Sequence, residues 1–216
     1  RLRPSPGKRE KKTDMHYFIA RSMAVMTITM LFFAASHAVA SPAREQLEAT
    51  IDSIIKILED DTLKSEAYAA QRREALRKVI YARFDFEKMS QLSLARHWRD
   101  RTPAERQTFV RLFSRLLEDT YVGKIEAYND EKVHYVKEQI RDNKAQIDTV
   151  VVGDTIEIPI DYRMYAAADG QWRVYDMVVE GVSLVANYRS QFSRMLESDS
   201  FESLIRQLEE KTGSTS

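Results

Sequence analysis

The segment from Gln171 to Met195 most constrains the fold, because a strand that is apolar on both faces runs directly into an amphipathic helix. Alternation puts two apolar sets on opposite faces of the strand, Trp172, Val174 and Val178 on one and Tyr175, Met177 and Val179 on the other. Gly181 ends the strand, and Ser183 is the predicted N-cap of the helix. The helix has one apolar face, formed by Leu184, Val185, Tyr188, Phe192 and Met195. This pattern is typical of a core strand with its covering helix, and it can also form the wall and rim of an apolar cavity.

Helical patterns come before the predicted sheet. Apolar stripes indicate helices over 43–60 and 66–83, and Asp85 is the predicted cap of a short helix that follows them. Thr102 precedes a proline at the first helical position and a glutamate three residues on, so a long helix is expected from there to about Tyr128. Its apolar face is wide and aromatic, with Phe109, Leu112, Phe113, Leu116, Leu117 and Tyr121.

Alternating patterns and turn residues then indicate strands over 133–136, 145–151, 156–164 and 172–179. Gly153-Asp154 and Asp169-Gly170 are the predicted turns between them. Pro159 predicts an edge strand or a bulge, because proline cannot donate to a sheet. Asp199 is the predicted cap of a last helix. The order predicts an α+β fold: an antiparallel meander of three to four curved strands, packed with N- and C-terminal helices around an apolar cavity.

Residues 15–40 have the pattern of a cleaved signal peptide. Arg21 precedes an apolar run, and Ala38-Val39-Ala40 is a cleavage signal before Ser41. The run is about 13 residues, too short to span a bilayer comfortably, although an uncut short membrane helix is the alternative. Residues 1–14 are basic without apolar periodicity and resemble an over-long translation start. We therefore expect a single domain over 41–212 and a disordered tail over 213–216.

Charge and composition exclude several classes of protein. The whole chain has 33 basic and 33 acidic residues, and removing 1–40 leaves 26 and 31, a formal charge of −5. A mildly acidic domain is a poor candidate for nucleic-acid binding. The chain has no cysteine, which excludes disulfides and thiol chemistry.

Few residues suggest catalysis or metal binding. His97 and His134 lie in different predicted elements, and neither has a second ligand at metal-binding spacing. The chain has no G-x-S-x-G and no glycine-rich phosphate loop. Curved sheets with helices do host acid–base isomerases, so a base at Asp176, with Tyr162 and Tyr188 near a cavity mouth, is the alternative function. The sequence indicates no partner for Asp176 that would tune it as a base.

Four segments resemble one protein family. They are YDMVVEGVSLVANYRSQF (175–192), FDFEKMSQLSLARHWRDRTPAERQTFVRLFSRLLEDTY (84–121), IPIDYRMYAAADGQWRVYD (158–176) and FESLIRQLEEK (201–211). They are similar to the signature segment, central helices, hairpin and closing helix of the MlaC family, also called the toluene-tolerance auxiliary family. The match covers nearly all of the chain after residue 41.

The resemblance implies a soluble phospholipid carrier of the periplasm and no enzyme. Such a carrier maintains outer-membrane lipid asymmetry by exchanging phospholipid with an inner-membrane ABC transporter that has an MCE-domain subunit, and with an outer-membrane lipoprotein–porin complex. It would be a monomer without metal or cofactor, with phospholipid as cargo. The predicted lipid-binding residues are Trp98, Phe109, Phe113, Leu116, Leu117, Tyr121, Tyr162, Val174, Met177, Val179, Val182, Leu184, Val185, Tyr188 and Phe192. Arg173 and Arg189 are weaker candidates for the lipid head group.

The energetics of such a cargo can be bounded. Two acyl chains carry about 30 methylenes, worth on the order of 25 kcal/mol against water at roughly 0.8 kcal/mol each. A bilayer offers the same gain, so transfer from membrane to protein is nearly neutral, as a carrier requires. A rigid empty hole of about 1,000 Å³ would cost roughly 24 kcal/mol, more than the usual stability of a domain. We therefore expect a protein that collapses when empty or purifies with lipid.

Overall fold

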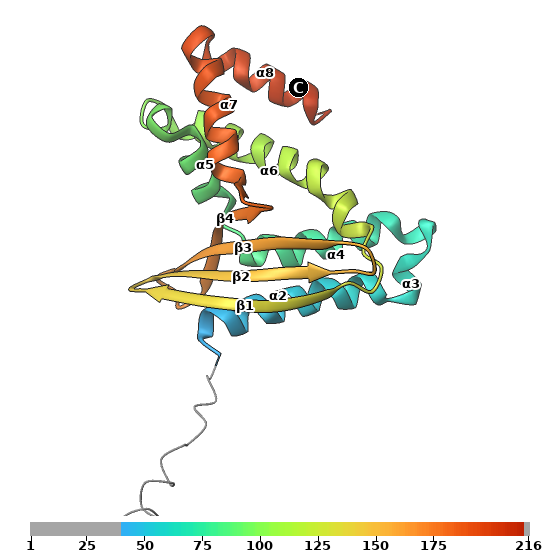
Figure 1. Ribbon diagram of the computed structural model, residues 1–216. Coiled ribbons are helices and arrows are strands. Elements are labelled where there is room, and N and C mark those ends of the chain that lie inside the picture. The colour runs from blue at the N-terminus through green and yellow to red at the C-terminus, as the bar shows by residue number, and fades with distance from the viewer. Residues whose placement is uncertain (1–39, 214–216) are drawn as a thin grey trace, which may run out of the picture. The chain divides into compact units, whose positions relative to one another are not determined.

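The computed structural model describes residues 40–213, and the chain from Ala40 onward forms one compact unit (Figure 1). The predicted signal peptide and residues 1–14 lie outside the described residues, as do 214–216 of the predicted tail. The helices before the sheet are α2 (Pro42–Glu59), α3 (Asp61–Lys64), η1 (Glu66–Tyr68), α4 (Ala69–Arg83), α5 (Phe86–Leu94), η2 (Ala95–Trp98) and α6 (Pro103–Glu126). The strands are β1 (Lys132–Arg141), β2 (Lys144–Val152), β3 (Glu157–Ala166), β4 (Trp172–Val179) and β5 (Val182–Ser183), and α7 (Leu184–Ser198) and α8 (Phe201–Lys211) follow.

The α+β class and the antiparallel meander are confirmed. The strands pair in chain order, β1-β2-β3-β4-β5, and every pair is antiparallel. The sheet has five strands rather than three to four, because the chain after Gly181 pairs Val182 with Val179 before it enters α7. Gly181 and Glu180 both have positive φ, of 79° and 50°, as a two-residue hairpin turn requires.

Helix starts follow the predicted caps with one exception. The Thr102 side chain accepts from the Glu105 amide, and the Glu105 carboxylate accepts from the Thr102 amide at 2.6 Å. The Ser183 hydroxyl accepts from the Ala186 amide at 3.0 Å at the start of α7. The prediction for α8 was wrong by one residue, because Ser200 is its N-cap, while the Asp199 carboxylate accepts from the Ser203 hydroxyl.

A bulge in β4 corrects the predicted faces of this strand. Arg163 pairs with Asp176 and Met164 pairs with Val174, which leaves Tyr175 as an extra residue. The alternation therefore resets, so that Val174 and Met177 both contribute to the core on the α2 face of the sheet. Val178 lies on the other face with Asp176, not with Val174 as predicted.

Two more strand predictions were wrong. β1 is ten residues long and continues past the predicted end at Val136, because a bulge at Val136 interrupts the alternation of the strand without ending it. Pro159 lies in β3, an inner strand, and is not at a bulge. The Pro159 carbonyl accepts a hydrogen bond from the Glu180 amide, so it faces β4. The nitrogen of the same residue faces β4 too, but the pairing of β3 with β4 begins only at Ile160. The missing donor therefore removes no ladder bond.

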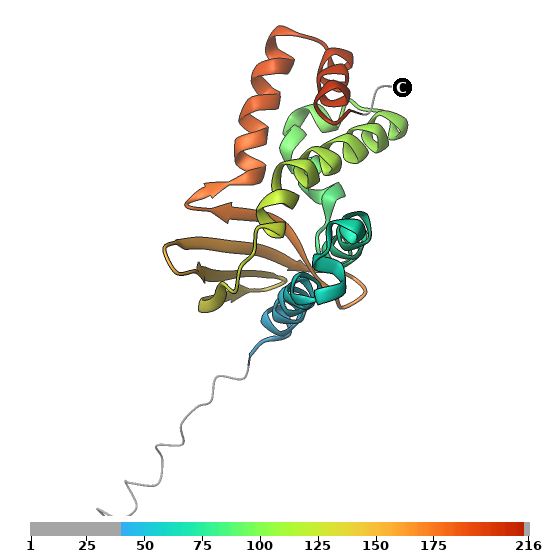
Figure 2. The same ribbon diagram turned by 90° about the vertical axis from the view of Figure 1, so that its right-hand side faces the viewer.

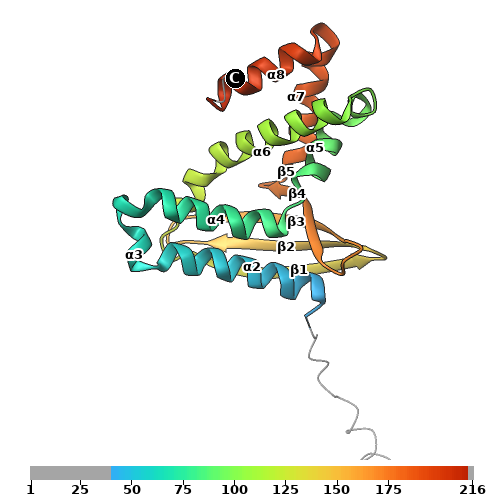
Figure 3. The ribbon, with the colours of Figure 1, turned by 180° about the vertical axis from the view of Figure 1, so that it is seen from behind.

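Two cores lie in two layers of the described chain. In Figures 1 and 3, α2 and α4 cover one face of the sheet, while α5, α6, α7 and α8 gather beyond β4. The sheet core comprises Ala43, Leu47, Ile51, Ala145, Ile147, Tyr162, Met164 and Val174. The helical core comprises Met89, Leu94, Trp98, Phe109, Leu112, Phe113, Leu117, Val185, Phe192, Phe201, Leu204 and Leu208. Among the described residues, Phe84 alone packs against both cores, so we call the boundary between them the seam.

Candidate functional site

An open groove of about 560 Å³ lies at the seam. Its lining comes from α4, the α4–α5 junction, α5, α6 and β4, and consists of Tyr81, Phe84, Asp85, Phe86, Glu87, Gln107, Val110, Arg111, Ser114 and Arg173. The apolar part is aromatic: the Tyr81 and Phe86 ring centroids are 4.4 Å apart, and those of Phe84 and Phe86 are 6.2 Å apart. Figure 2 shows α4 beneath α6, the two helices that flank this groove.

The rim of the groove carries charges of both signs. Asp85 accepts a hydrogen bond from the Tyr165 hydroxyl and caps α5 through the Lys88 amide at 2.8 Å. Burial and the neighbouring Asp85 raise the pKa of Tyr165 to about 12. Arg173 forms an ion pair with Asp169 in the β3–β4 turn. Arg111 also lines the groove, from α6.

Ion pairs connect α4 to α6 beside the groove. The Arg77 guanidinium lies 2.6 Å from the Glu118 carboxylate, and Arg72 and Arg73 each lie 3.0 Å from the Glu126 carboxylate. We call these three contacts the α4–α6 ion pairs. Burial opposes ionisation of Glu126, but the hydrogen bonds from Arg73 and Arg72 prevail and hold its pKa below the usual value. The Glu126 side chain is only 10% exposed, so solvent screens these contacts less than an ordinary surface pair.

Asp176 is a structural residue at the junction of β4 and α7. Its carboxylate accepts hydrogen bonds from Arg163 at 2.9 Å, from the Ser183 hydroxyl at 2.7 Å and from the Val185 amide at 3.0 Å. The expectation that nothing pairs with Asp176 was therefore wrong, and the carboxylate is fully engaged in the fold.

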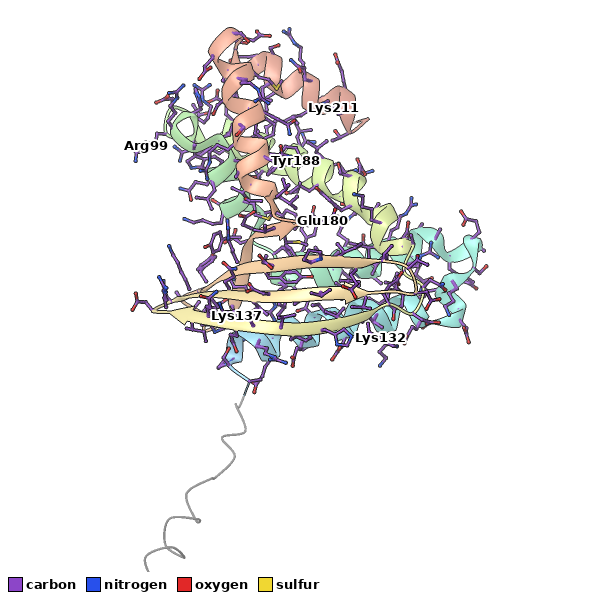
Figure 4. All side chains as sticks on the ribbon, viewed as in Figure 1. Arg99, Lys132, Lys137, Glu180, Tyr188 and Lys211 are labelled. Carbon is purple, nitrogen blue, oxygen red and sulfur yellow. The ribbon has the colours of Figure 1, made fainter. Side chains whose placement is uncertain are left out.

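The three residues of the alternative acid–base site also lie apart. Tyr162 lies in the sheet core, on the face of the sheet opposite Asp176. Tyr188 lies on α7 (Figure 4) and packs against the helical core. Burial raises the pKa of Tyr162 to about 12. The suggested meeting of Tyr162, Asp176 and Tyr188 at a cavity mouth was therefore wrong.

Most of the predicted lipid-binding residues belong to one or the other core, and none of the fifteen lines the groove. Those within or against the helical core are Trp98, Phe109, Phe113, Leu116, Leu117, Tyr121, Val185, Tyr188 and Phe192. Those within or against the sheet core are Tyr162, Val174 and Met177. Leu184 is buried outside both cores, Val179 is half-buried, and Val182 is 54% exposed. Their contact with lipid stays a prediction.

Several of these side chains are only half-buried, and they belong to both layers. They are Leu116, Tyr121 and Tyr188 in the helical layer and Met177 and Val179 in β4. Burial and the nearby Tyr188 phenol raise the pKa of Tyr121. Half-buried apolar surface on both sides of the seam can contact an apolar ligand without unfolding either core.

The two head-group candidates occupy different places. Arg173 lines the groove. Arg189 instead donates from Nε to the Leu92 carbonyl at 2.8 Å and so ties α7 to α5. Sequence reasoning did not select Tyr81, Phe84, Phe86 and Val110 as groove residues. The three aromatic residues clustered between 81 and 86 were the available signal.

Within residues 40–213, no group of three or more His, Asp or Glu side chains is placed to hold a metal ion. In the same part of the chain, no helix is both long and apolar enough to cross a bilayer.

Comparison with known proteins adds two findings. The family model described as MlaC protein matches residues 48–210, which is more than half of the chain. The chain is also similar to a solved structure of a phospholipid-binding protein from Ralstonia solanacearum in complex with a phospholipid. The two share 24% sequence identity with a TM-score of 0.72, over 80% of this chain and 98% of the other. At this identity the likeness establishes a common fold.

Proposed function

The chain belongs to the MlaC family, and from this premise we propose that it is a phospholipid-binding carrier protein. The observation that carries the proposal is the seam, where two separately packed cores meet at Phe84 beside an apolar groove of about 560 Å³. The similar Ralstonia solanacearum protein was solved with a phospholipid bound. A ligand that enters between the two cores can be released again, because neither core has to unfold.

Acyl chains are the part of the ligand that suits this site. The groove has an aromatic floor and a charged, open rim, so acyl chains can lie inside while the head group stays in water. The burial gain of about 0.8 kcal/mol per methylene matches the gain in a bilayer, so loading and release are both accessible. Arg111 and Arg173 are the rim cations that can meet a phosphate, and water competes for both. Head-group selection should therefore be weak.

The carrier would act in the periplasm between two membrane complexes. In this proposal it exchanges phospholipid with an inner-membrane ABC transporter bearing an MCE-domain subunit, and with an outer-membrane lipoprotein–porin complex. Residues 15–40 would be the cleaved signal peptide that takes it there. The protein would contain no metal or cofactor and would perform no ATP chemistry. Pull-down of each membrane complex with tagged protein, from cells expressing the full chain, tests these partners.

Lipid analysis tests the binding function directly. The protein is purified from the periplasm, measured by native mass spectrometry, and then extracted with organic solvent. A mass excess that matches a glycerophospholipid, with the same lipid in the extract, is the expected result. A protein of unmodified mass that also takes up no lipid from vesicles would contradict the proposal.

A further inference from the structure

The groove ends beside the contacts between α4 and α6. Tyr81 and Ser114 line the groove from these two helices, and Arg77 and Glu118 pair one turn further along each helix. Arg72 and Arg73 pair with Glu126 beyond them. Contacts therefore follow one line along two antiparallel helices, with an apolar opening at one end and ion pairs along the rest.

The groove alone has room for less than a diacyl lipid. Its volume is about 560 Å³, whereas a pair of acyl chains needs about 1,000 Å³, the top of the usual range for ligand sites. The missing volume has to come from a neighbouring interface that can separate. Both cores are filled by their own side chains, and opening either would expose residues such as Phe109 and Ile147, which are fully buried.

In the part of the chain that the structure describes, the α4–α6 contacts beside the groove are ion pairs, whereas each core is held by packed apolar side chains. Arg73 and Arg77 are 55% and 38% exposed, whereas Arg72, Glu118 and Glu126 are 14%, 16% and 10% exposed. Separating these pairs therefore costs more than separating a surface pair, but water can solvate the released charges, whereas opening either core would expose apolar side chains. The layers stay joined elsewhere, through the Asp176 contacts with α7 and through the Asp85 amide, which donates to the Val174 carbonyl at 2.8 Å.

We propose that the interface between α4 and α6 is the subsite for the second acyl chain of a diacyl lipid, and that the α4–α6 ion pairs close it. This inference rests on the proposed phospholipid-binding function. One chain occupies the groove lined by Phe84, Phe86 and Val110. The second enters only when Arg77 separates from Glu118 and the two arginines separate from Glu126. A single-chain lipid needs no such separation.

The test compares two lipids and two variants. Glu118→Gln combined with Glu126→Gln removes the charge of both acceptors while keeping their size. Asp119→Asn is the matched control, because Asp119 neighbours Glu118 but pairs only with Arg115 on the same helix. Uptake of a fluorescent diacyl phosphatidylcholine and of fluorescent lysophosphatidylcholine is followed from net-neutral vesicles by stopped flow. Net-neutral vesicles keep salt from altering membrane docking.

Diacyl uptake should accelerate about 3- to 10-fold in the double variant, and single-chain uptake should keep the wild-type rate. The Asp119→Asn control should match wild type with both lipids. Equal diacyl rates in the wild type and the double variant would overturn the inference. If wild-type protein takes up neither lipid, the proposed function itself fails.

A second measurement needs no variant. Raising the salt concentration from about 0.05 M to 0.5 M shortens the screening length several-fold, and Arg73 and Arg77 are exposed enough for salt to weaken their ion pairs, so diacyl uptake by wild-type protein should accelerate, but less than in the double variant. Single-chain uptake should not change over the same range. A diacyl rate that is independent of salt would overturn the inference even if the double variant does not fold.

Discussion

Replacing Asp176 by alanine should be one of the most damaging single changes at the junction of sheet and helices. The substitution leaves the Arg163 cation without its partner and leaves the Ser183 hydroxyl and the Val185 amide without an acceptor. Removing one member of a buried ion pair costs about 3–5 kcal/mol. The Arg163 side chain is 40% exposed and water can solvate part of it, so we expect the low end, about 3 kcal/mol.

Urea denaturation measures this loss. With a slope of about 2 kcal/mol per M for a domain of this size, the midpoint should fall by roughly 1.5 M while the slope stays constant. Asp119→Ala is the control, because it removes an exposed contact within one helix and should cost less than about 0.5 kcal/mol. A loss below about 1 kcal/mol for Asp176→Ala would refute the view that this carboxylate holds α7 on the sheet.

Three further changes test separate parts of the structure. Phe113→Ala should lower the free energy of unfolding by about 3–5 kcal/mol in urea denaturation, because Phe113 is fully buried against other rings; a loss under about 1 kcal/mol would contradict its packing. Val182→Glu should leave stability within about 0.5 kcal/mol, because Val182 is 54% exposed. Co-purified phospholipid should nevertheless drop sharply in that variant, and unchanged lipid content would remove Val182 from the predicted contacts. Burial raises the pKa of Tyr162 to about 12, so wild-type stability should fall as pH rises from about 10 towards 12, and Tyr162→Phe should lose less over the same interval. Equal losses in the two proteins would contradict that raised pKa.

Local signals predicted the helices well. Thr102 with Glu105, and Ser183 before an apolar stripe, place the starts of α6 and α7 correctly, because capping depends on residues close in sequence. The faces of β4 could not be predicted. Both faces of this strand are apolar, so its pattern gives no signal for the bulge at Tyr175. The position of Pro159 in an inner strand could not be predicted either, because a proline is tolerated there only if the neighbouring strand β4 ends beside it.

The site was less accessible to sequence reasoning than the fold. The pairing of Asp176 with Arg163 depends on the register of β3 against β4, which the bulge shifts. The groove is built from α4, α5, α6 and β4, which come together only in the folded chain. In the sequence, nothing distinguishes Phe84 from an ordinary core residue. The periodicity of apolar residues therefore identified residues of both cores, but it did not identify the seam between the cores.

Expected mutational effects change once burial is known. Phe113 is among the predicted lipid-binding residues, so Phe113→Glu would be an obvious test of lipid binding from the sequence alone. Phe113 is fully buried in the helical core, so a glutamate there would disrupt folding before it reported on lipid. Val182→Glu is the better test, because its exposed position separates binding from folding.

The most direct measurement is photo-crosslinking with a phospholipid that carries a diazirine in one acyl chain, followed by peptide mapping. If acyl chains lie in the groove at the seam, the labelled peptides should be those that line it, around Phe84, around Val110 and around Arg173. Labelling confined to the exposed strand β1, or no labelling above that of denatured protein, would contradict lipid binding at the seam.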